Sequence, residues 1–357
     1  MDETDLLRAL VEAYSPSGKE TEAVRRFTDT ASSLGFSVDV DEAGNGIARR
    51  GSGTPQVLFL GHIDTVDGDL PVRVAGGRIY GRGTCDAKGA LIAALLAGRS
   101  HAGPGEIVVV AAVGEELDSR GARFLIPRFR PDFLIVGEPS GWSGVTIGYK
   151  GNLSLVVTFT GERTHLSSPS PTTVEVALSF ISRLREFCED HTGPTPFSSA
   201  TAKVHTINTR RSGGGEVVDV HVNLRSPPGV QSEQVVKFVQ ETKLASGIRV
   251  VDRSEAVEAG RNETVRAISN GIRLEGGSPK LLRKLGTSDM NLAVPAWGCP
   301  AAAYGPGDGH LGHTDEESLE VRELEKSIRV LEAAFASLVG RKPTAAPAQL
   351  AAPAMSQ

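Results

Sequence analysis

The stretch VLFLGHIDTVDGDL (residues 57–70) begins as an apolar run and ends in ionisable side chains. Residues 57–60 are all apolar, which is typical of a strand that is covered on both faces. After Gly61 the chain becomes polar, with His62 and Asp64 two positions apart. In an open α/β sheet, ligands bind outside the carboxyl ends of the strands. This stretch therefore predicts a polar site at the end of a central strand.

Three further runs share the apolar character of residues 57–60. They are EIVVVAAV (106–113), FLIV (133–136) and AAAY (301–304), and we expect each to be a buried strand. The segment KGALIAALLAG (88–98) is apolar nearly all round, as in a helix that packs on a sheet. Strands that alternate with helices predict an α/β fold of the doubly wound class with a mainly parallel sheet.

Ionisable side chains lie close to each of these predicted elements. They are Glu115 and Glu116 after 106–113, Glu138 after 133–136, His310 and His313 after 301–304, and Asp86 just before the apolar helix. Each has an ordinary explanation by itself, such as surface charge or a hydrogen-bonded histidine. Because the ends of parallel strands meet at one edge of a sheet, the combination predicts a single cluster there.

Carboxylates gathered at one edge repel one another, which disfavours their charged forms. A pair of divalent cations would offset this repulsion, and histidine with aspartate or glutamate suits Zn²⁺, Co²⁺ or Mn²⁺. The three cysteines, Cys85, Cys188 and Cys299, have no paired spacing of the kind that thiolate zinc sites show. Three ligands per ion are available if one carboxylate bridges, and one glutamate is then left as a general base.

The composition is that of an ordinary globular protein, with 357 residues, of which 39% are hydrophobic and 23% charged. The net charge of −5 argues against broad binding of nucleic acid. The sequence has no apolar run of transmembrane length, and its acidic start is unlike a secretion signal, so we expect a cytoplasmic protein without a membrane partner.

The arginine-rich pieces ARFLIPRFRP and NTRRS are interpreted as solvated surfaces or, alternatively, as docking patches for an acidic partner.

The middle of the chain has a different pattern, which predicts an inserted α+β domain. We expect strands at 153–161, 202–210 and 217–225, the last two joined by the turn RSGGGE. One helix is expected to begin at Thr172, where Glu175 completes a capping box, and another to cover 233–244. The expected domains are a catalytic domain at 1–149 and 261–340, an inserted domain at 150–260, and a disordered tail rich in alanine and proline at 341–357.

Six motifs along the chain resemble those of the M20 metallopeptidases. In order, they are GHIDTV, GRGTCDAKGAL, GEELDSRGA, VGEPS, GTSDMN and GPGDGHLGHTDEE. The resemblance implies a hydrolase of amide bonds that uses two divalent metal ions, with Zn²⁺ expected before Co²⁺ or Mn²⁺. It also implies that residues 150–260 form a ferredoxin-like lid or dimerisation domain, and that the protein is a homodimer.

The same resemblance implies a role for each ionisable residue of the predicted cluster. The implied metal ligands are His62 and Glu138 for the first ion, Glu116 and His313 for the second, and Asp86 as the bridge between them. Glu115 would be the general base. Asp64 would orient His62 through the second ring nitrogen. The peptide bond between Asp86 and Ala87 would be cis, as it often is in this family.

Further residues match family positions that contact the substrate. His165 resembles a histidine that relatives lend to the active site of the neighbouring subunit, where it stabilises an oxyanion; a surface histidine in a turn is the alternative. Arg225, in VNLRSPPG, resembles an arginine that binds a substrate carboxylate, a task that suits a guanidinium group. Thr287, Ser288 and Asp289 are expected near the substrate.

Within the family, KLGTSDMNLAV and YGPGDGHLGHTDEESLEV resemble one branch in particular. Its members release lysine or ornithine from the C-terminal glutamate of a small acidic amino-group carrier protein in lysine and arginine biosynthesis. Alternatives within the family are acetylornithine deacetylase, succinyl-diaminopimelate desuccinylase and a broader dipeptidase or carboxypeptidase, which would act on small N-acyl amino acids or peptides. An alternative of another class is a non-catalytic binding module that has kept the fold.

Overall fold

The computed structural model describes residues 2–163, 165 and 167–341. The contacts within the chain separate two compact units. The first unit comprises Met1–Ile147, Arg261–Leu282 and Ala293–Gln357, and the second comprises Gly148–Gly260 and Arg283–Leu292. From residue 342 onward, the tail that the sequence predicted to be disordered lies outside the described residues.

One segment departs from the domain boundaries expected from the sequence. Residues 283–292 were expected in the catalytic domain, whereas Arg283–Leu292 groups with the second unit. Hydrogen bonds give the physical reason, because Asn291 Nδ2 donates to the main-chain oxygens of Lys150 at 3.0 Å and Glu255 at 2.7 Å. These bonds hold the segment against the two ends of the inserted stretch.

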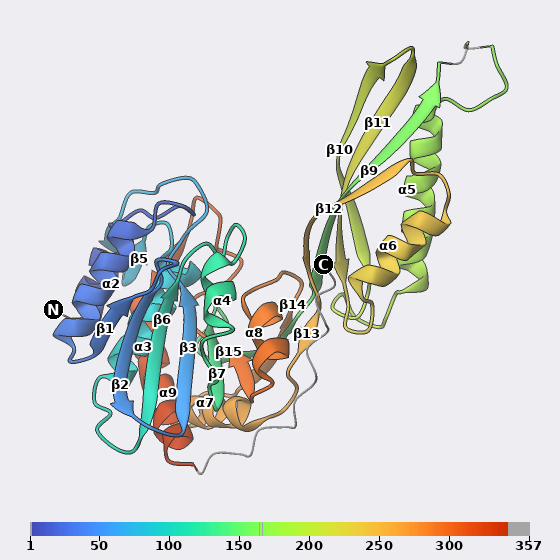
Figure 1. Ribbon diagram of the computed structural model, residues 1–357. Coiled ribbons are helices and arrows are strands. Elements are labelled where there is room, and N and C mark those ends of the chain that lie inside the picture. Colours follow the sequence, from blue (N-terminus) through green and yellow to red (C-terminus); the bar gives the residue numbers. More distant parts are fainter. Residues whose placement is uncertain (1, 164, 166, 342–357) are drawn as a thin grey trace. The chain divides into compact units, whose positions relative to one another are not determined.

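The first unit is built on a sheet whose strands follow the order β1-β2-β6-β3-β7-β15-β8 (Figure 1). The bounds are β1 (Ser37–Val40), β2 (Gly46–Ser52), β3 (Gln56–His62), β6 (Gly105–Ala112), β7 (Phe133–Gly137), β8 (Gly144–Tyr149) and β15 (Ala301–Ala303). The four neighbours β6, β3, β7 and β15 pair in parallel, and the pairs on either side of them are antiparallel. The four apolar runs therefore form the parallel centre of the sheet, and the predicted α/β fold with a mainly parallel sheet is confirmed.

Helices of the first unit pack against this sheet and one another. They are α1 (Glu3–Val11), α2 (Thr21–Ser33), α3 (Gly89–Gly98), α4 (Arg120–Leu125), α7 (Glu263–Leu274) and α9 (Val321–Val339), and α8 (Met290–Trp297) runs across the boundary between the units. Every residue of α3 is buried, because α3 contacts α1, α9, β3 and β6. An edge-to-face pair of Phe59 and Phe335, with ring centroids 6.4 Å apart, links β3 to α9. Among the described residues, no helix has both the length and the apolar character needed to cross a membrane.

A small antiparallel sheet brings two distant segments of the first unit together. Its strands, in the order β16-β5-β4, are β16 (Ser318–Glu320), β5 (Arg78–Tyr80) and β4 (Arg73–Ala75). Ser318 of β16 pairs with Tyr80 of β5. The loop that carries Asp86 follows β5, and the segment that carries His313 precedes β16. This pairing therefore places the two segments side by side.

The second unit contains an antiparallel sheet in the order β10-β11-β9-β12, with α5 and α6 beside it (Figure 1). Its bounds are β9 (Gly151–Glu162), α5 (Thr173–Asp190), β10 (Thr201–Ser212), β11 (Gly215–Ser226), α6 (Ser232–Glu241) and β12 (Gly247–Ser254). Two short strands, β13 (Val257–Glu258) and β14 (Lys280–Lys284), pair with β8. Thr172 and Glu175 form the predicted capping box at the start of α5, and β10 and β11 form the predicted hairpin. Apolar side chains of both helices and of the sheet form a separate core.

Candidate active site

Three parallel strands deliver the predicted cluster to one edge of the central sheet. His62 is the last residue of β3, Glu115 and Glu116 follow β6, and Glu138 follows β7 directly. Because β6, β3 and β7 are hydrogen-bonded neighbours that run in the same direction, their carboxyl ends lie together. Asp86 comes from the loop before α3, and His313 from the segment before β16.

His62 and Asp86 lie in contact at this edge. The Nε2 atom of His62 lies 3.2 Å from Oδ1 of Asp86 and 4.0 Å from Oε1 of Glu138. The side chain of His62 is almost completely buried, and that of Glu138 is largely so. One imidazole nitrogen and two carboxylates therefore converge on a small volume shielded from water.

The second carboxylate oxygen of Asp86 faces a different histidine. Asp86 Oδ2 lies 3.4 Å from Nε2 of His313, and the same nitrogen lies 2.8 Å from Oε1 of Glu116. Donor atoms of Asp86, Glu116 and His313 all lie within 4.8 Å of one another. Asp86 thus presents one oxygen to His62 and the other to His313, which is the geometry that a bridging carboxylate requires.

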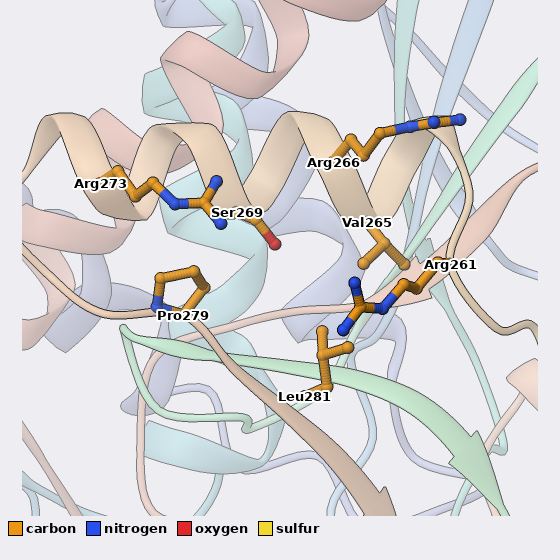
Figure 2. Close-up of a pocket in the computed structure, with 7 residues that line it drawn as sticks. All are labelled: Arg261, Val265, Arg266, Ser269, Arg273, Pro279 and Leu281. Carbon is orange, nitrogen blue, oxygen red and sulfur yellow. The ribbon is translucent and has the colours of Figure 1, made fainter.

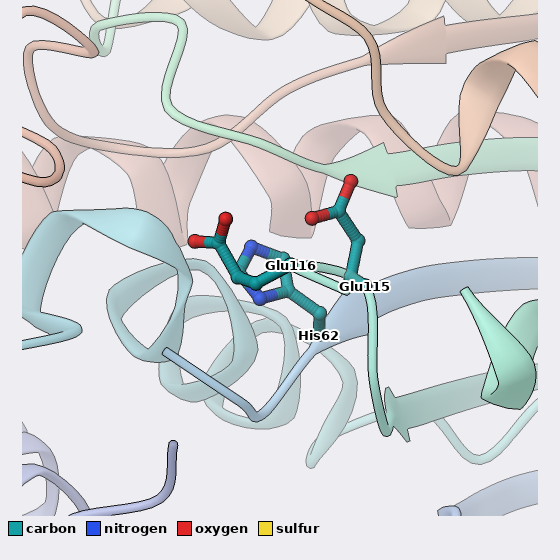
Figure 3. A group of neighbouring side chains, drawn as sticks. All are labelled: His62, Glu115 and Glu116. Carbon is teal, nitrogen blue, oxygen red and sulfur yellow. The ribbon is translucent and has the colours of Figure 1, made fainter. Parts of the chain in front are cut away.

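Glu115 and Glu116 project from the loop after β6 on different sides of the His62 ring (Figure 3). Donor atoms of His62, Glu115 and Glu116 lie within 4.8 Å of one another. Both glutamates therefore belong to the same cluster, while their carboxylates point in different directions.

Hydrogen bonds and charge shift the pKa values of the clustered groups. Burial by itself lowers the pKa of His62, but hydrogen bonds to Asp64 and Asp86 and the charge of Glu115 outweigh burial and raise it well above its ordinary value. Hydrogen bonds to Asp86 and Glu116 raise the pKa of His313 to about 10. Burial raises the pKa of Asp86, but the hydrogen bonds from His313 and His62 have the larger combined effect, so that the net shift is downward. The metal-free cluster therefore favours the protonated forms of its histidines.

Asp64 holds the backbone of the glutamate pair. It is fully buried, and its carboxylate accepts hydrogen bonds from the amides of Glu115 and Glu116, each at 3.1 Å, and from Ser17 Oγ at 2.7 Å. The family resemblance implied that Asp64 orients His62 through the second ring nitrogen. The oxygen nearest to Nδ1 of His62 is the main-chain carbonyl of Asp64, at 3.0 Å, and the nearest carboxylate oxygen is 3.6 Å away. A carbonyl oxygen only accepts, so Nδ1 carries the hydrogen and Nε2 is directed toward the cluster.

Backbone geometry around Asp86 and His313 is unusual. The peptide bond between Asp86 and Ala87 is cis, as the family resemblance implied. His313 has a φ of 65°, in the left-handed region that non-glycine residues rarely adopt. At Gly312 an added Cβ would lie 2.8 Å from Oδ2 of Asp86, so only glycine lets this segment approach the carboxylate so closely. His310, the weaker ligand candidate, is exposed and belongs to neither of the two donor groups found among the described residues.

The remaining predicted residues lie in the second unit. Arg225 Nη1 donates to Thr287 Oγ1 at 3.3 Å, and Ser288 Oγ accepts from the amide of Met290 at 3.2 Å. Asp289, the residue after Ser288, is buried. His165 is exposed, and its Nδ1 lies 2.6 Å from Ser167 Oγ.

Comparison with known proteins identifies the family. The sequence profile of "Peptidase family M20/M25/M40" matches residues 58–337. The chain belongs to this family. The [LysW]-lysine hydrolase of Deinococcus radiodurans is 36% identical to this M20-family chain over 350 residues, which are 94% of this chain and 97% of the relative. A relative from Thermococcus kodakarensis, provisionally named for both lysine and ornithine conjugates, is 39% identical over 351 residues, 97% of this chain and 94% of its own.

Solved structures of M20 peptidases share the fold. An M20 family metallo-carboxypeptidase from Sulfolobus solfataricus superposes with a TM-score of 0.77 at 17% identity, covering 95% of this chain and 99% of its own. The aminopeptidase PepT of Bacillus cereus gives a TM-score of 0.75 at 19% identity, covering 96% of this chain and all of its own.

Membership of the M20 family implies a divalent-metal hydrolase of amide bonds, and the donor set fits this chemistry. Imidazole nitrogens and carboxylate oxygens, with one carboxylate between two histidines, are ligands that Zn²⁺ and similar ions accept. The sequence analysis did not identify Ser17 or Gly312. Ser17 donates a hydrogen bond to Asp64, and Gly312 lies so close to Asp86 that a Cβ there would be 2.8 Å from Oδ2. The stretch around Ser17, SPSG (residues 15–18), has no local pattern that would signal a contact with residue 64.

Proposed function

We propose that this protein releases lysine or ornithine from the C-terminal glutamate of an acidic amino-group carrier protein, by metal-dependent hydrolysis of the connecting amide bond. The observation that carries the proposal is the cluster in which Asp86 faces both His62 and His313. Near full-length similarity to relatives named as hydrolases of such conjugates supports the choice of substrate. We place this reaction in the cytoplasm, in lysine or arginine biosynthesis.

In this proposal the cluster would hold two ions. His62 and Glu138 would be ligands of the first, Glu116 and His313 would be ligands of the second, and Asp86 would be shared between them. We propose Zn²⁺ as the resident ion, with Co²⁺ or Mn²⁺ as substitutes that the same nitrogen and oxygen donors accept. When bound, the ions supply Lewis acidity toward water and toward the amide carbonyl.

The side chains of the protein move the protons. Glu115 is held near His62 through the hydrogen bond from its main-chain amide to Asp64, and its carboxylate is proposed to accept a proton from the attacking water. The same carboxyl group then donates that proton to the leaving amine, which becomes the amino group of the released amino acid. In a homodimer, His165 of the second unit is proposed to stabilise the oxyanion in the active site of the neighbouring subunit.

Recognition of the released amino acid is assigned to the second unit. Arg225 donates to Thr287 Oγ1, and the guanidinium has further donors with which to bind a carboxylate of the substrate. Ser288 and Asp289 follow Thr287 directly, and both are buried. We propose that this group binds the amino-acid end of the conjugate.

We place the docking surface for the carrier protein beside α7. A pocket of about 300 Å³ is lined by three arginines together with smaller side chains (Figure 2). The lining residues are Arg261, Val265, Arg266, Ser269, Arg273, Pro279 and Leu281. Residues 261–282 contain four basic and two acidic side chains, in a chain with a net charge of −5. We propose this surface, the arginine pocket, as the docking site of the acidic carrier, because opposite charges steer such partners together.

A substrate panel tests the proposed function. The purified, metal-loaded protein would be assayed with a carrier–lysine conjugate, a carrier–ornithine conjugate, N-acetylornithine, N-succinyl-diaminopimelate and a dipeptide. The proposal expects a carrier conjugate to have the highest kcat/KM. Efficient cleavage of N-acetylornithine with no cleavage of either conjugate would instead identify an acetylornithine deacetylase. Binding of metal and conjugate without turnover of any substrate would identify a non-catalytic binding module.

A further inference from the structure

A buried ion pair lies behind the loop that carries Asp86. Arg82 Nη1 donates to Oε2 of Glu317 at 3.0 Å, and the two side chains are 4% and 1% exposed. Neither residue belongs to the proposed ligand set. Burial of two charges is costly even when they are paired, so such a pair is weak evidence for a role in stability. The other contacts of both side chains indicate a different role.

Glu317 holds the backbone of the loop that leads to Asp86. Its Oε1 accepts hydrogen bonds from the amides of Gly83 at 2.9 Å, Cys85 at 3.3 Å and Asp86 at 3.3 Å. One carboxylate oxygen therefore fixes the main chain at three positions, including the proposed bridging ligand. Glu317 itself lies four residues after His313, in the segment that delivers the second histidine.

Arg82 makes the reciprocal connections. From the Asp86 loop, its Nη1 donates to the main-chain oxygen of Thr314 at 2.9 Å, and its Nε donates to that of Gly68 at 2.9 Å. Thr314 follows His313 directly, and Gly68 lies in the stretch that continues from His62. The two side chains thus tie together three of the segments that deliver proposed ligands.

We propose that Arg82 and Glu317 are positioning residues that set the distance between Asp86 and His313, and thereby the affinity for the second metal ion. The proposal rests on the ligand roles assigned under the proposed function. The second ion is affected more than the first, because Asp86 and His313 both depend on these contacts for their placement. His62 and Glu138, on β3 and directly after β7, are fixed independently by the central sheet.

Glu317→Gln is the most direct test, because it removes the charge but keeps nearly the same shape. Metal-free protein would be titrated with Zn²⁺ in competition with a chromophoric chelator, and Co²⁺ binding would be followed by its visible absorption. We expect a rise of about 10–100-fold in the Kd of the more weakly bound ion, the range typical of groups that support metal ligands. The matched control is Glu316→Gln, the same change at the exposed neighbouring residue, which should leave both Kd values as in the wild type.

The outcomes separate this proposal from the proposed function. If the wild-type protein binds fewer than two ions, the ligand assignment fails and this proposal fails with it. If the wild type binds two ions and the folded Glu317→Gln protein binds them with unchanged Kd values and an unchanged Co²⁺ spectrum, only the positioning role is overturned, even if thermal stability falls. Should Glu317→Gln not fold, Arg82→Lys keeps the charge but loses the guanidinium contacts, and normal binding of both ions by that variant would overturn the proposal in the same way.

Discussion

The carboxylate of Asp64 accepts a hydrogen bond from the main-chain amide of Glu115, with 3.1 Å between Oδ1 and the nitrogen. Its other oxygen accepts from the next amide, that of Glu116, and from the hydroxyl of Ser17. The buried aspartate therefore fixes the backbone of the proposed general base and of a proposed ligand together. The main-chain oxygen of the same residue holds His62. Asp64 thus supports three members of the cluster and belongs to neither of the two donor groups found among the described residues.

We expect Asp64→Asn to lower kcat/KM by about 10–100-fold, the usual range for a residue that supports metal ligands. An amide has one acceptor oxygen, and its NH₂ group would face an amide donor, so one of the two glutamate amides would lose its partner. Steady-state kinetics with metal analysis would measure the effect. Asp67→Asn, the same change at an exposed position, is the control. Equal activity of the two variants would contradict the supporting role.

Glu115→Gln is expected to retain metal and lose turnover. The amide has nearly the shape of the carboxylate but does not accept a proton from water, so kcat should fall by about 10²–10⁴-fold, as for other general bases. Metal content by elemental analysis and kcat by a lysine-release assay would be measured on the same preparation. Near-normal turnover in a fully loaded variant would remove Glu115 from the role of base.

Metal affinity should rise with pH. Hydrogen bonds to Asp86 and Glu116 raise the pKa of His313 to about 10, and that of His62 is also raised, so the metal-free protein favours the protonated form of both rings. A metal ion needs the unprotonated nitrogen, so binding must displace these protons. Below the raised pKa values, each displaced proton should increase the association constant by about tenfold per pH unit.

Titrations of the metal-free protein with Zn²⁺ at pH 6, 7 and 8 would test whether the affinity for the ion rises with pH. Calorimetry in buffers of different ionisation enthalpy would count the released protons. An association constant that is independent of pH over this range, once metal–buffer binding is corrected, would mean that the histidines are already unprotonated or do not bind the ion.

The arginine pocket predicts a difference between carrier-bound and small substrates. The double variant Arg261→Glu and Arg273→Glu should raise KM for the carrier conjugate by about tenfold at low ionic strength, because it replaces attraction by repulsion. A small N-acyl lysine should be hydrolysed as by the wild type. The effect should decline with added salt, since exposed charges are screened.

A charge-matched control is available for that experiment. Arg99→Glu with Arg185→Glu makes the same change in net charge at exposed arginines that do not line the pocket. If both double variants raise KM equally, the effect is one of net charge and the pocket is not the docking site.

Much of the fold and cluster was predictable because the signals are local. Apolar runs identified the strands that form the parallel centre, and the polar residue after each run lies where the strand ends, as with His62 and Glu138. The capping box of Thr172 and Glu175 is a four-residue pattern that fixes the start of α5 by itself. Such patterns depend on periodicity and on neighbours in the sequence, which a single chain displays directly.

The supporting contacts were not predictable, because they join distant segments. Ser17 and Asp64 are 47 positions apart, and Glu317 reaches an amide 231 positions away. Neither serine nor glutamate has a local pattern that indicates such a partner. The grouping of Arg283–Leu292 with the second unit has the same cause, since the hydrogen bonds of Asn291 reach Lys150 and Glu255, near the two ends of the inserted stretch.

Gly312→Ala should weaken binding at the second metal site. The new Cβ would lie 2.8 Å from Oδ2 of Asp86, closer than van der Waals contact allows, so this oxygen or the His313 segment must move. The displaced oxygen is the one that faces His313. We expect the Kd of the more weakly bound Zn²⁺ to rise by about tenfold, within the range for disturbed ligand support. Gly103→Ala, where the added Cβ meets its nearest neighbour at an ordinary 3.8 Å, is the control. Both proteins would be titrated with Zn²⁺ after their folding has been checked by circular dichroism. If the Kd values of Gly312→Ala equal those of Gly103→Ala, metal binding does not depend on the present position of Oδ2 of Asp86.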